Sequence, residues 1–196
     1  LTTYYVSPTG SASNAGTSEA LPWNWTKVQT QALVNGFFSG DTILIQRGGT
    51  YTGRAYFEEQ GPLTIGAYGS GARPIITGAG ALSAFQAVLG FDSCDRVDIA
   101  DLTVRNEIQA NTYAVASVHI LNQYKVRRIT IRRCDLGYAG LEAVFLGYGS
   151  AWATNEGALV EGCTISYCGD NGVGGYGYLR DIVVRRCAFS YIGRGT

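Results

Sequence analysis

Three segments in the second half of the chain repeat one another without gaps, and this repeat restricts the fold more than any other feature. Each begins with a cysteine, has a tyrosine four positions later and a glycine six positions later, and they span residues 134–140, 163–169 and 187–193. An earlier, more divergent copy contains Val97, and its position recurs after 32, 29 and 24 residues, at Ile129, Ala158 and Ile182. Units of this size and variable length are typical of a solenoid whose loops differ between coils.

Apolar residues alternate within each copy. Val97 and Ile99 precede a short break, and Leu102 and Val104 follow it. A period of two indicates strands, and no segment offers the intervening helix that an ordinary βαβ arrangement requires. Short strands joined by bends can bury their apolar faces only by coiling and stacking. The sequence therefore predicts an all-β solenoid, a parallel β-helix.

Stacking places equivalent residues of successive coils in columns, about 4.8 Å apart. Cys134, Cys163 and Cys187 then form an inward column that continues from Leu102. Their side chains project in parallel, which is poor geometry for a disulfide. We therefore expect buried thiols that act as small apolar residues.

A second predicted column is aromatic and consists of Tyr138, Tyr167 and Tyr191, whose rings are expected to stack. Outward positions carry charges of alternating sign. Arg132, Glu161 and Arg185 share one column, and Asp101 lies over Arg133 in another. Exposed ion pairs of this kind contribute only about 0–1 kcal/mol each, so we expect them mainly to fix the register of the coils.

The first 40 residues are expected to form an N-terminal segment with a capping helix, and residues 41–196 the coils. In residues 26–38 the apolar side chains fall largely on one helical face: Val28, Leu33, Val34, Phe37 and Phe38. Thr26 is the predicted N-cap, and Gly40 the predicted stop. Such a helix would shield the edge of the first coil, whose first strand is expected at residues 42–45.

The first third of the chain contains the motifs YYVSPTGSASNAGTS, GDTILIQRGGTYTG and LTIGAYGSGARPIITG. With these motifs the chain resembles, over essentially its whole length, right-handed parallel β-helix proteins of the pectate-lyase-like superfamily. The resemblance implies a right-handed coil, a secreted or cell-surface location and a polysaccharide as substrate or ligand. It identifies no reaction, because the superfamily includes lyases, hydrolases, epimerases and phage tailspikes.

Polysaccharide lyases on this fold need a base that removes the proton beside a uronate carboxylate, and cations that stabilise the developing anion. The resemblance implies lysine or arginine for these roles. The candidates are Lys125, Arg127 and Arg128, because the only other lysine, Lys27, belongs to the predicted cap. A solvated charge at a corner of the coil is the alternative reading of Lys125.

Calcium is the one cofactor that the sequence suggests, at Asp92, Asp95 and Asp98. Hard cations prefer several carboxylate oxygens, and the resemblance implies a calcium ion held in this way. Turn formation and charge pairing also explain this run of aspartates, because the neighbouring coils add no carboxylate to their columns.

Sugar rings are expected to stack on aromatic side chains in the long insertion at residues 147–157. Trp152 and Tyr148 lie in this insertion, and loops on a rigid scaffold commonly carry binding residues. In the alternative reading, Trp152 folds back over its own loop.

Lysine and arginine total 15, as do aspartate and glutamate, so the formal net charge is zero. A neutral chain with scattered charges argues against a nucleic-acid partner, and the chain contains no apolar run that could span a membrane. The last copy of the repeat is followed by no predicted cap, so a second copy of the chain is a candidate partner at the open C-terminal coil. Two hypotheses follow. The first is an extracellular domain that acts on or binds polysaccharide, and the second is a structural module that assembles end to end into oligomers or filaments.

Overall fold

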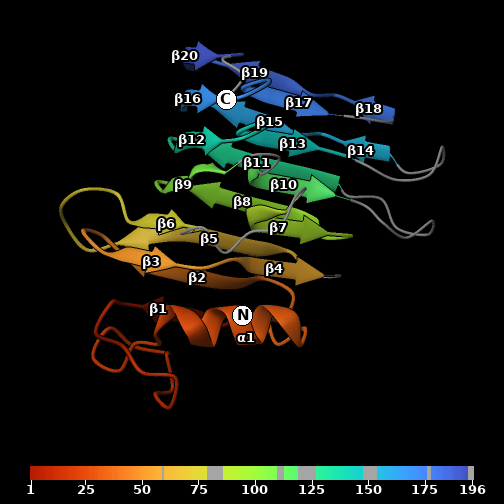
Figure 1. Ribbon diagram of the computed structural model, residues 1–196. Helices are drawn as coiled ribbons and strands as arrows, with labels where there is room; N and C mark the ends of the chain where they lie inside the picture. Colours follow the sequence, from red (N-terminus) through yellow and green to blue (C-terminus); the bar gives the residue numbers. More distant parts are fainter. Residues whose placement is uncertain are drawn as a thin grey trace.

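The structure is a computed structural model that describes residues 1–58, 60–78, 86–109, 113–118, 127–147, 154–175 and 178–193. In this part of the chain, short strands wind into coils that stack on one another above a single helix, α1 (Trp25–Leu33) (Figure 1). Every strand pair is parallel, as in Ile131 with Ile99 on one side and with Val160 on the other. The predicted right-handed parallel β-helix is therefore confirmed.

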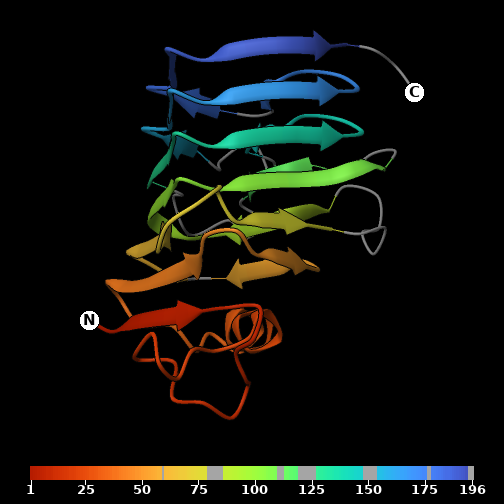
Figure 2. The ribbon, with the colours of Figure 1, turned by 90° about the vertical axis from the view of Figure 1, so that its left-hand side faces the viewer.

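The strands form three sheets, one along each side of the stack. Sheet A contains β1 (Thr3–Val6), β2 (Asp41–Gln46), β5 (Leu63–Tyr68), β8 (Asp95–Ala100), β11 (Arg127–Arg132), β14 (Thr154–Glu156), β15 (Leu159–Glu161), β18 (Tyr178–Arg180) and β19 (Val183–Arg185). Sheet B contains β3 (Thr50–Thr52), β6 (Ile75–Thr77), β9 (Thr103–Gln109), β12 (Asp135–Ala139), β16 (Thr164–Cys168) and β20 (Ala188–Ile192). Sheet C contains β4 (Ala55–Glu58), β7 (Ala87–Asp92), β10 (Tyr113–Val118), β13 (Val144–Leu146) and β17 (Val173–Gly175). Figure 2 views the stack from the side of sheet B.

The core is built from columns of side chains that repeat from coil to coil. One column on sheet A runs through Ile43, Ile65, Ile99, Ile131 and Val160, all of which are buried. Alternate residues of each strand point outward, so the period of two in the sequence decides which side chains form the core.

The predicted cysteine column is confirmed. Cys134 and Cys163 are buried, and Cys187 is partly buried. The Thr164 amide donates a hydrogen bond to the Cys134 carbonyl, and the Ala188 amide donates one to the Cys163 carbonyl, both with an N···O distance of 2.9 Å. The contact with the Cys134 thiol lowers the pKa of Cys163 to about 7.

The predicted ion pairs between coils are also present. Arg133 donates two hydrogen bonds to the Asp101 carboxylate, at 2.9 and 2.6 Å. Glu161 lies 3.8 Å from Arg132 and 2.8 Å from Arg185. The first pair joins the corners that follow β8 and β11, and the other two join β11 to β15 and β15 to β19, so they hold equivalent positions of successive coils in register.

The N-terminal segment differs from the prediction in three ways. The N-cap is Asn24, not Thr26, and its Oδ1 accepts a hydrogen bond from the Lys27 amide at 2.9 Å. The helix ends at Leu33, well before Gly40. The first strand is β1, which precedes the helix and pairs with β2.

The predicted apolar face of this helix was only partly right. Val28 and Phe37 are buried, whereas Leu33, Val34 and Phe38 are exposed. The face that packs on the first coil instead uses Trp25, Val28 and Ala32, at spacings of three and four residues. The chain leaves the helical conformation at Asn35, whose φ is 51°, so the later residues cannot continue that face. The helix still covers the first coil, as predicted (Figure 1).

Asp41 fastens this N-terminal segment to the coils. Its carboxylate is fully buried and accepts hydrogen bonds from the Thr2 amide at 2.8 Å and the Phe38 amide at 2.9 Å. Among the described residues no helix has the length and apolar character needed to cross a bilayer.

Candidate functional site

The predicted basic and aromatic candidates are largely beyond the described part of the chain. Lys125, Tyr148 and Trp152 lie outside the described residues. Arg127 is placed by its backbone alone, which pairs with Asp95 and Glu156. Arg128 is exposed. The predicted catalytic role of these basic residues and the predicted sugar stacking on Trp152 and Tyr148 stay predictions.

The structure does not bring the three candidate calcium ligands together. Asp92 is 2% exposed and accepts hydrogen bonds from the Tyr56 hydroxyl at 2.8 Å and the Ser93 hydroxyl at 2.9 Å. Asp95 and Asp98 are exposed on β8. Over the described ranges no three or more His, Cys, Asp or Glu side chains are placed to hold a metal ion. The geometry therefore gives the calcium prediction no support.

A different set of residues stands out on the outer face of sheet C. Tyr56 lies between the buried Ala55 and Phe57, so its ring points outward. In register with it, one position per coil, are Gly90, Ala116, Phe145 and Gly174. This outward column therefore has aromatic residues at positions separated by small ones. We call it the sheet C column.

At the end of the column nearer the N-terminus, Arg54 and Tyr56 cover Gly90. The Arg54 guanidinium lies 4.3 Å from the centroid of the Tyr56 ring, a cation–π contact. A Cβ at Gly90 would lie 2.7 Å from Cδ2 of Tyr56, so only glycine lets the ring lie across the strand. Burial raises the pKa of Tyr56, which keeps the phenol protonated as the donor to Asp92, and burial lowers the pKa of Arg54. Nε of Arg54 is buried and has no hydrogen-bond partner in the described structure.

At the other end of the column, a carboxyl group lies beside an aromatic pair. The rings of Tyr113 and Phe145 stack at 4.7 Å with an interplanar angle of 22°. Glu142 is 8% exposed, and its Oε1 accepts a hydrogen bond of 3.5 Å from the Asn171 amide. A Cβ at Gly174 would lie 2.7 Å from Cγ and 2.8 Å from Oε1 of Glu142. The glycine is therefore what gives the carboxyl its space.

Burial raises the pKa of Glu142, and the charge of Asp170 raises it further, whereas the hydrogen bond from Asn171 lowers it. Burial, together with the charge of Glu142, raises the pKa of Tyr113 to about 12. Glu142 is thus an acid that keeps its proton to a higher pH than an ordinary glutamate. A carboxyl in this condition can donate a proton to a bound molecule.

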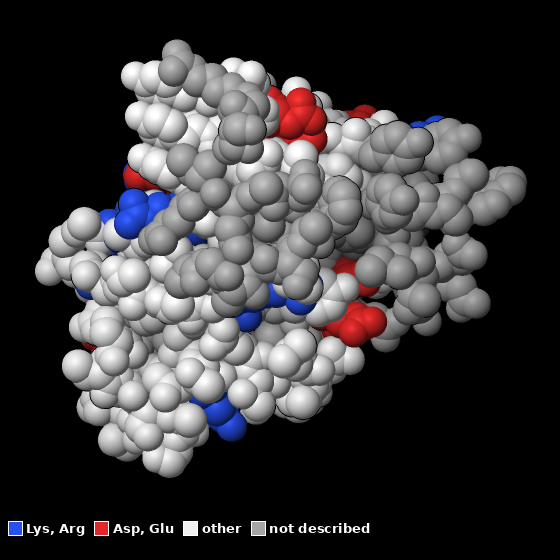
Figure 3. Space-filling model, in the orientation of Figure 1, with Lys and Arg blue, Asp and Glu red and all other residues white. Residues whose placement is uncertain are grey.

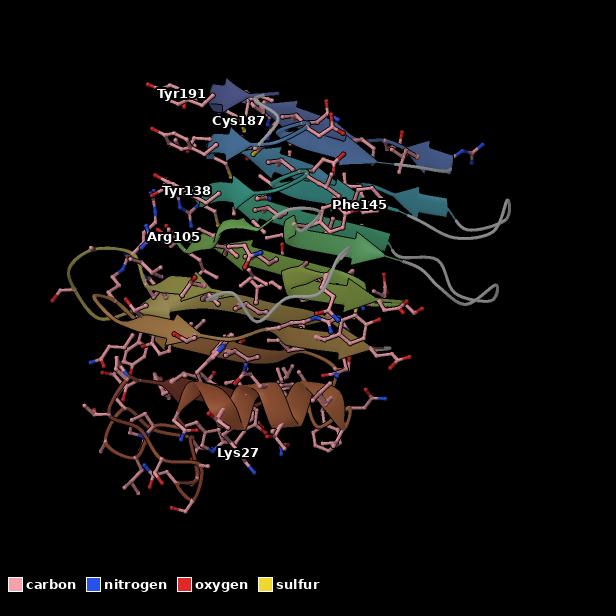
Figure 4. All side chains as sticks on the ribbon, in the orientation of Figure 1. Lys27, Arg105, Tyr138, Phe145, Cys187 and Tyr191 are labelled. Atoms are coloured by element: carbon pink, nitrogen blue, oxygen red, sulfur yellow. The ribbon has the colours of Figure 1, made fainter. Side chains whose placement is uncertain are left out.

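Sequence reasoning did not find this set, because its members are spread over five coils and none belongs to a local motif. The register was the available signal: once the coils are aligned, Tyr56 and Phe145 fall in one column of sheet C with only glycine and alanine between them. Phe145 lies on the opposite side of the stack from Tyr138 and Tyr191 (Figure 4). On the face seen in Figure 3, the described Lys and Arg groups are scattered among uncharged residues and acidic groups, without a continuous basic patch.

The last described coil exposes part of its apolar residues. Val184 is 40% exposed and Phe189 is 49% exposed. End-on association through this coil stays a prediction.

Comparison with known proteins shows which solved structures share this fold. No family model matches the chain, and no curated protein matches it. Among solved structures, a GH136 lacto-N-biosidase from Eubacterium ramulus superimposes with a TM-score of 0.72 and 17% identity, over 98% of this chain and 42% of that protein. The chain thus spans about two fifths of its length.

Two lyases share the fold as well. An alginate lyase from Paenibacillus sp. str. FPU-7 has a TM-score of 0.56 and 16% identity, over 87% of this chain and 66% of the lyase. A rhamnogalacturonan lyase has a TM-score of 0.51 and 13% identity, over 99% of this chain and 69% of the lyase. The resemblance to parallel β-helix proteins is therefore confirmed at the level of the fold.

Proposed function

We propose that this chain is a polysaccharide-acting β-helix domain that holds a sugar chain on the outer face of sheet C. The observation that carries the proposal is the placement of Glu142, a mostly buried carboxyl of raised pKa, beside the stacked rings of Tyr113 and Phe145. Pockets that bind small polar ligands typically combine aromatic side chains with a few well-placed polar groups and a residue of shifted pKa.

The sheet C column suggests how the sugar chain would lie. Adjacent coils are about 4.8 Å apart, so successive sugar units along the column would meet successive coils. The Tyr56 ring lies across Gly90 and would form the floor at that end of the column. Arg54 would donate hydrogen bonds to sugar oxygens at one end, and the Tyr113–Phe145 pair would border a ring at the other.

The chemistry assigned to Glu142 is proton donation to a glycosidic oxygen. Departure of an alkoxide is the difficult part of cleaving a glycosidic bond, and a general acid removes that difficulty by protonating the leaving oxygen. The neighbours of similar fold are named as one glycosidase and two lyases, which supports a carbohydrate substrate without selecting hydrolysis or elimination. A polysaccharide does not cross a membrane, so the proposed site of action is outside the cell, on a secreted or surface-bound protein.

The test is a screen of the chain against neutral and acidic polysaccharides, with two readouts. New reducing ends report hydrolysis, and ultraviolet absorbance of an unsaturated product reports elimination. Glu142→Gln should lower the rate by about 10²- to 10⁴-fold, the usual contribution of a general acid, and leave binding largely intact. Glu19→Gln, in the exposed N-terminal loop, is the matched control and should behave as the unmodified chain.

Two results would count against the proposal in different ways. If Glu142→Gln cleaves as fast as the unmodified chain, the proton donor is wrongly assigned. If the unmodified chain neither binds nor cleaves any polysaccharide in the screen, the proposed function itself is wrong.

A further inference from the structure

The outer face of sheet B carries three tyrosines whose rings form a continuous stack. Tyr138 and Tyr167 lie 4.7 Å apart between ring centroids, and Tyr167 and Tyr191 lie 4.6 Å apart, with interplanar angles of 22° and 11°. This confirms the predicted column. Tyr167 is 39% exposed and Tyr191 48% exposed, and the side chains of Tyr138 and Tyr191 extend outward from the side of the stack that sheet B occupies (Figure 4).

All three tyrosines have a backbone conformation that bulky residues rarely adopt. Their φ values are 52°, 58° and 56°, in the left-handed region that favours glycine and asparagine. The same left-handed φ recurs at other corners of the coils, such as Asp101 at 62° and Arg133 at 52°. The conformation therefore belongs to the turns of the coil, and at these three turns it places the tyrosine rings next to one another.

Beside the rings runs a strip of small residues. Gly137, Ser166 and Ser190 are in register on successive coils. A Cβ at Gly137 would lie 1.8 Å from the Ser166 carbonyl oxygen, so this position admits no side chain. The strip therefore offers hydroxyl groups at the foot of a wall of tyrosine edges. We call the three tyrosines and this strip the sheet B surface.

Arg105 places a positive charge at the end of the sheet B surface that is nearer the N-terminus. Arg105 is in register with Gly137, and its guanidinium lies 6.0 Å from the centroid of the Tyr138 ring. Nearby, Arg73 is paired with Asp135 at 2.9 Å. In the described part of the chain, no carboxylate lies within ion-pair distance of Arg105. Among the side chains that the structure describes, Arg105 thus gives this surface a positive charge without an ion-pair partner.

We propose that the sheet B surface is a second saccharide-binding site, specific for a chain of sugars that bear carboxylates. Because the ring faces are covered by one another, the tyrosines would contact the sugars through their edges and phenolic oxygens. Ser166 and Ser190 would exchange hydrogen bonds with sugar hydroxyls, and Arg105 would bind a carboxylate through charge-assisted hydrogen bonds. The inference rests on the proposed function, but it places binding on a different sheet from the one that carries Glu142.

The experiment measures the affinity of the whole chain for polygalacturonate and for its fully methyl-esterified form, in which the same polymer has lost its charge. The unmodified chain should bind the acidic form at least about 10-fold more tightly, a difference of about 1.4 kcal/mol. Arg105→Gln should remove that preference. Arg96→Gln is the matched control, because Arg96 is exposed on β8 beside Asp95, and it should change neither affinity.

A second set of variants tests the tyrosine wall. Replacing Tyr138, Tyr167 and Tyr191 together by phenylalanine keeps the stack and removes the phenolic oxygens, so the fold should persist, as circular dichroism can verify, while affinity for polygalacturonate falls at least about 10-fold. If both this variant and Arg105→Gln bind polygalacturonate as the unmodified chain does, while Tyr113→Ala abolishes binding, the sheet B surface is refuted and the proposed function stands. If the unmodified chain binds no saccharide, both fail.

Discussion

Replacing Asp41 by alanine tests how the N-terminal segment is held to the coils. The Asp41 carboxylate accepts the amide hydrogens of Thr2 and Phe38 at 2.8 and 2.9 Å, and the substitution removes both hydrogen bonds. A hydrogen bond to a charged group contributes about 1.5–3 kcal/mol. Phe38 is exposed and Thr2 partly so, which lets water replace part of the loss, and we therefore expect about 3 kcal/mol less free energy of unfolding in total.

The assay is urea denaturation followed by tryptophan fluorescence, since Trp23 and Trp25 are buried close to this segment. Asp41→Asn retains one acceptor oxygen and should lose about half as much stability as the alanine variant. Asp98→Ala, an exposed position on β8, is the control and should stay within about 0.5 kcal/mol of the unmodified chain. A loss below about 1 kcal/mol for Asp41→Ala would show that these two hydrogen bonds do not hold the segment.

Three further outcomes follow from the coils. Gly137→Ala should lower the free energy of unfolding by about 2–3 kcal/mol in the same urea assay, because its Cβ would collide with the Ser166 carbonyl oxygen; an unchanged midpoint would mean that the strands separate easily. In the native chain a thiol reagent should modify Cys187 rapidly and the other four cysteines only after unfolding, because these four are buried; rapid modification of more than one thiol would contradict the buried column. Arg133 lowers the pKa of Asp101, so the stability that this pair contributes is present at neutral pH and is lost as the pH falls through the lowered pKa. Both side chains are at least partly exposed to solvent, which limits the contribution of this pair to the free energy of unfolding to under about 1 kcal/mol. In Arg133→Gln the free energy of unfolding should lose this dependence on pH.

Much of the fold could be predicted because, in a parallel β-helix, residues at equivalent positions of successive coils recur along the sequence. The repeated Cys and Tyr positions give the alignment of the coils, and that alignment is enough to predict the stacked rings of Tyr138 and Tyr167 and the pairing of Asp101 with Arg133. The N-terminal segment has no such repeat. There Asn24 and Thr26 are both residue types found at N-caps, and the local preference for asparagine over threonine agrees with the observed cap at Asn24.

The candidate site was harder to predict for the same physical reason. Tyr56 and Gly90, and likewise Tyr113 and Phe145, are far apart in the sequence and meet only because the coils stack. From the sequence alone, residues that are close together along the chain are the easiest to recognise as a group. For this reason Asp92, Asp95 and Asp98 were predicted as a metal site. Asp92 ends β7 on sheet C and is buried under Tyr56, whereas Asp98 lies on β8 and is exposed on sheet A.

All five cysteines are free thiols, and this determines how the stability of the fold depends on redox conditions. A disulfide would stabilise mainly by restricting the unfolded chain, and none is present to do so. The coils are then held together by side-chain packing, backbone hydrogen bonds and ion pairs, none of which a reductant breaks. The melting temperature should therefore be the same with and without reductant, because there is no disulfide between coils for a reductant to break.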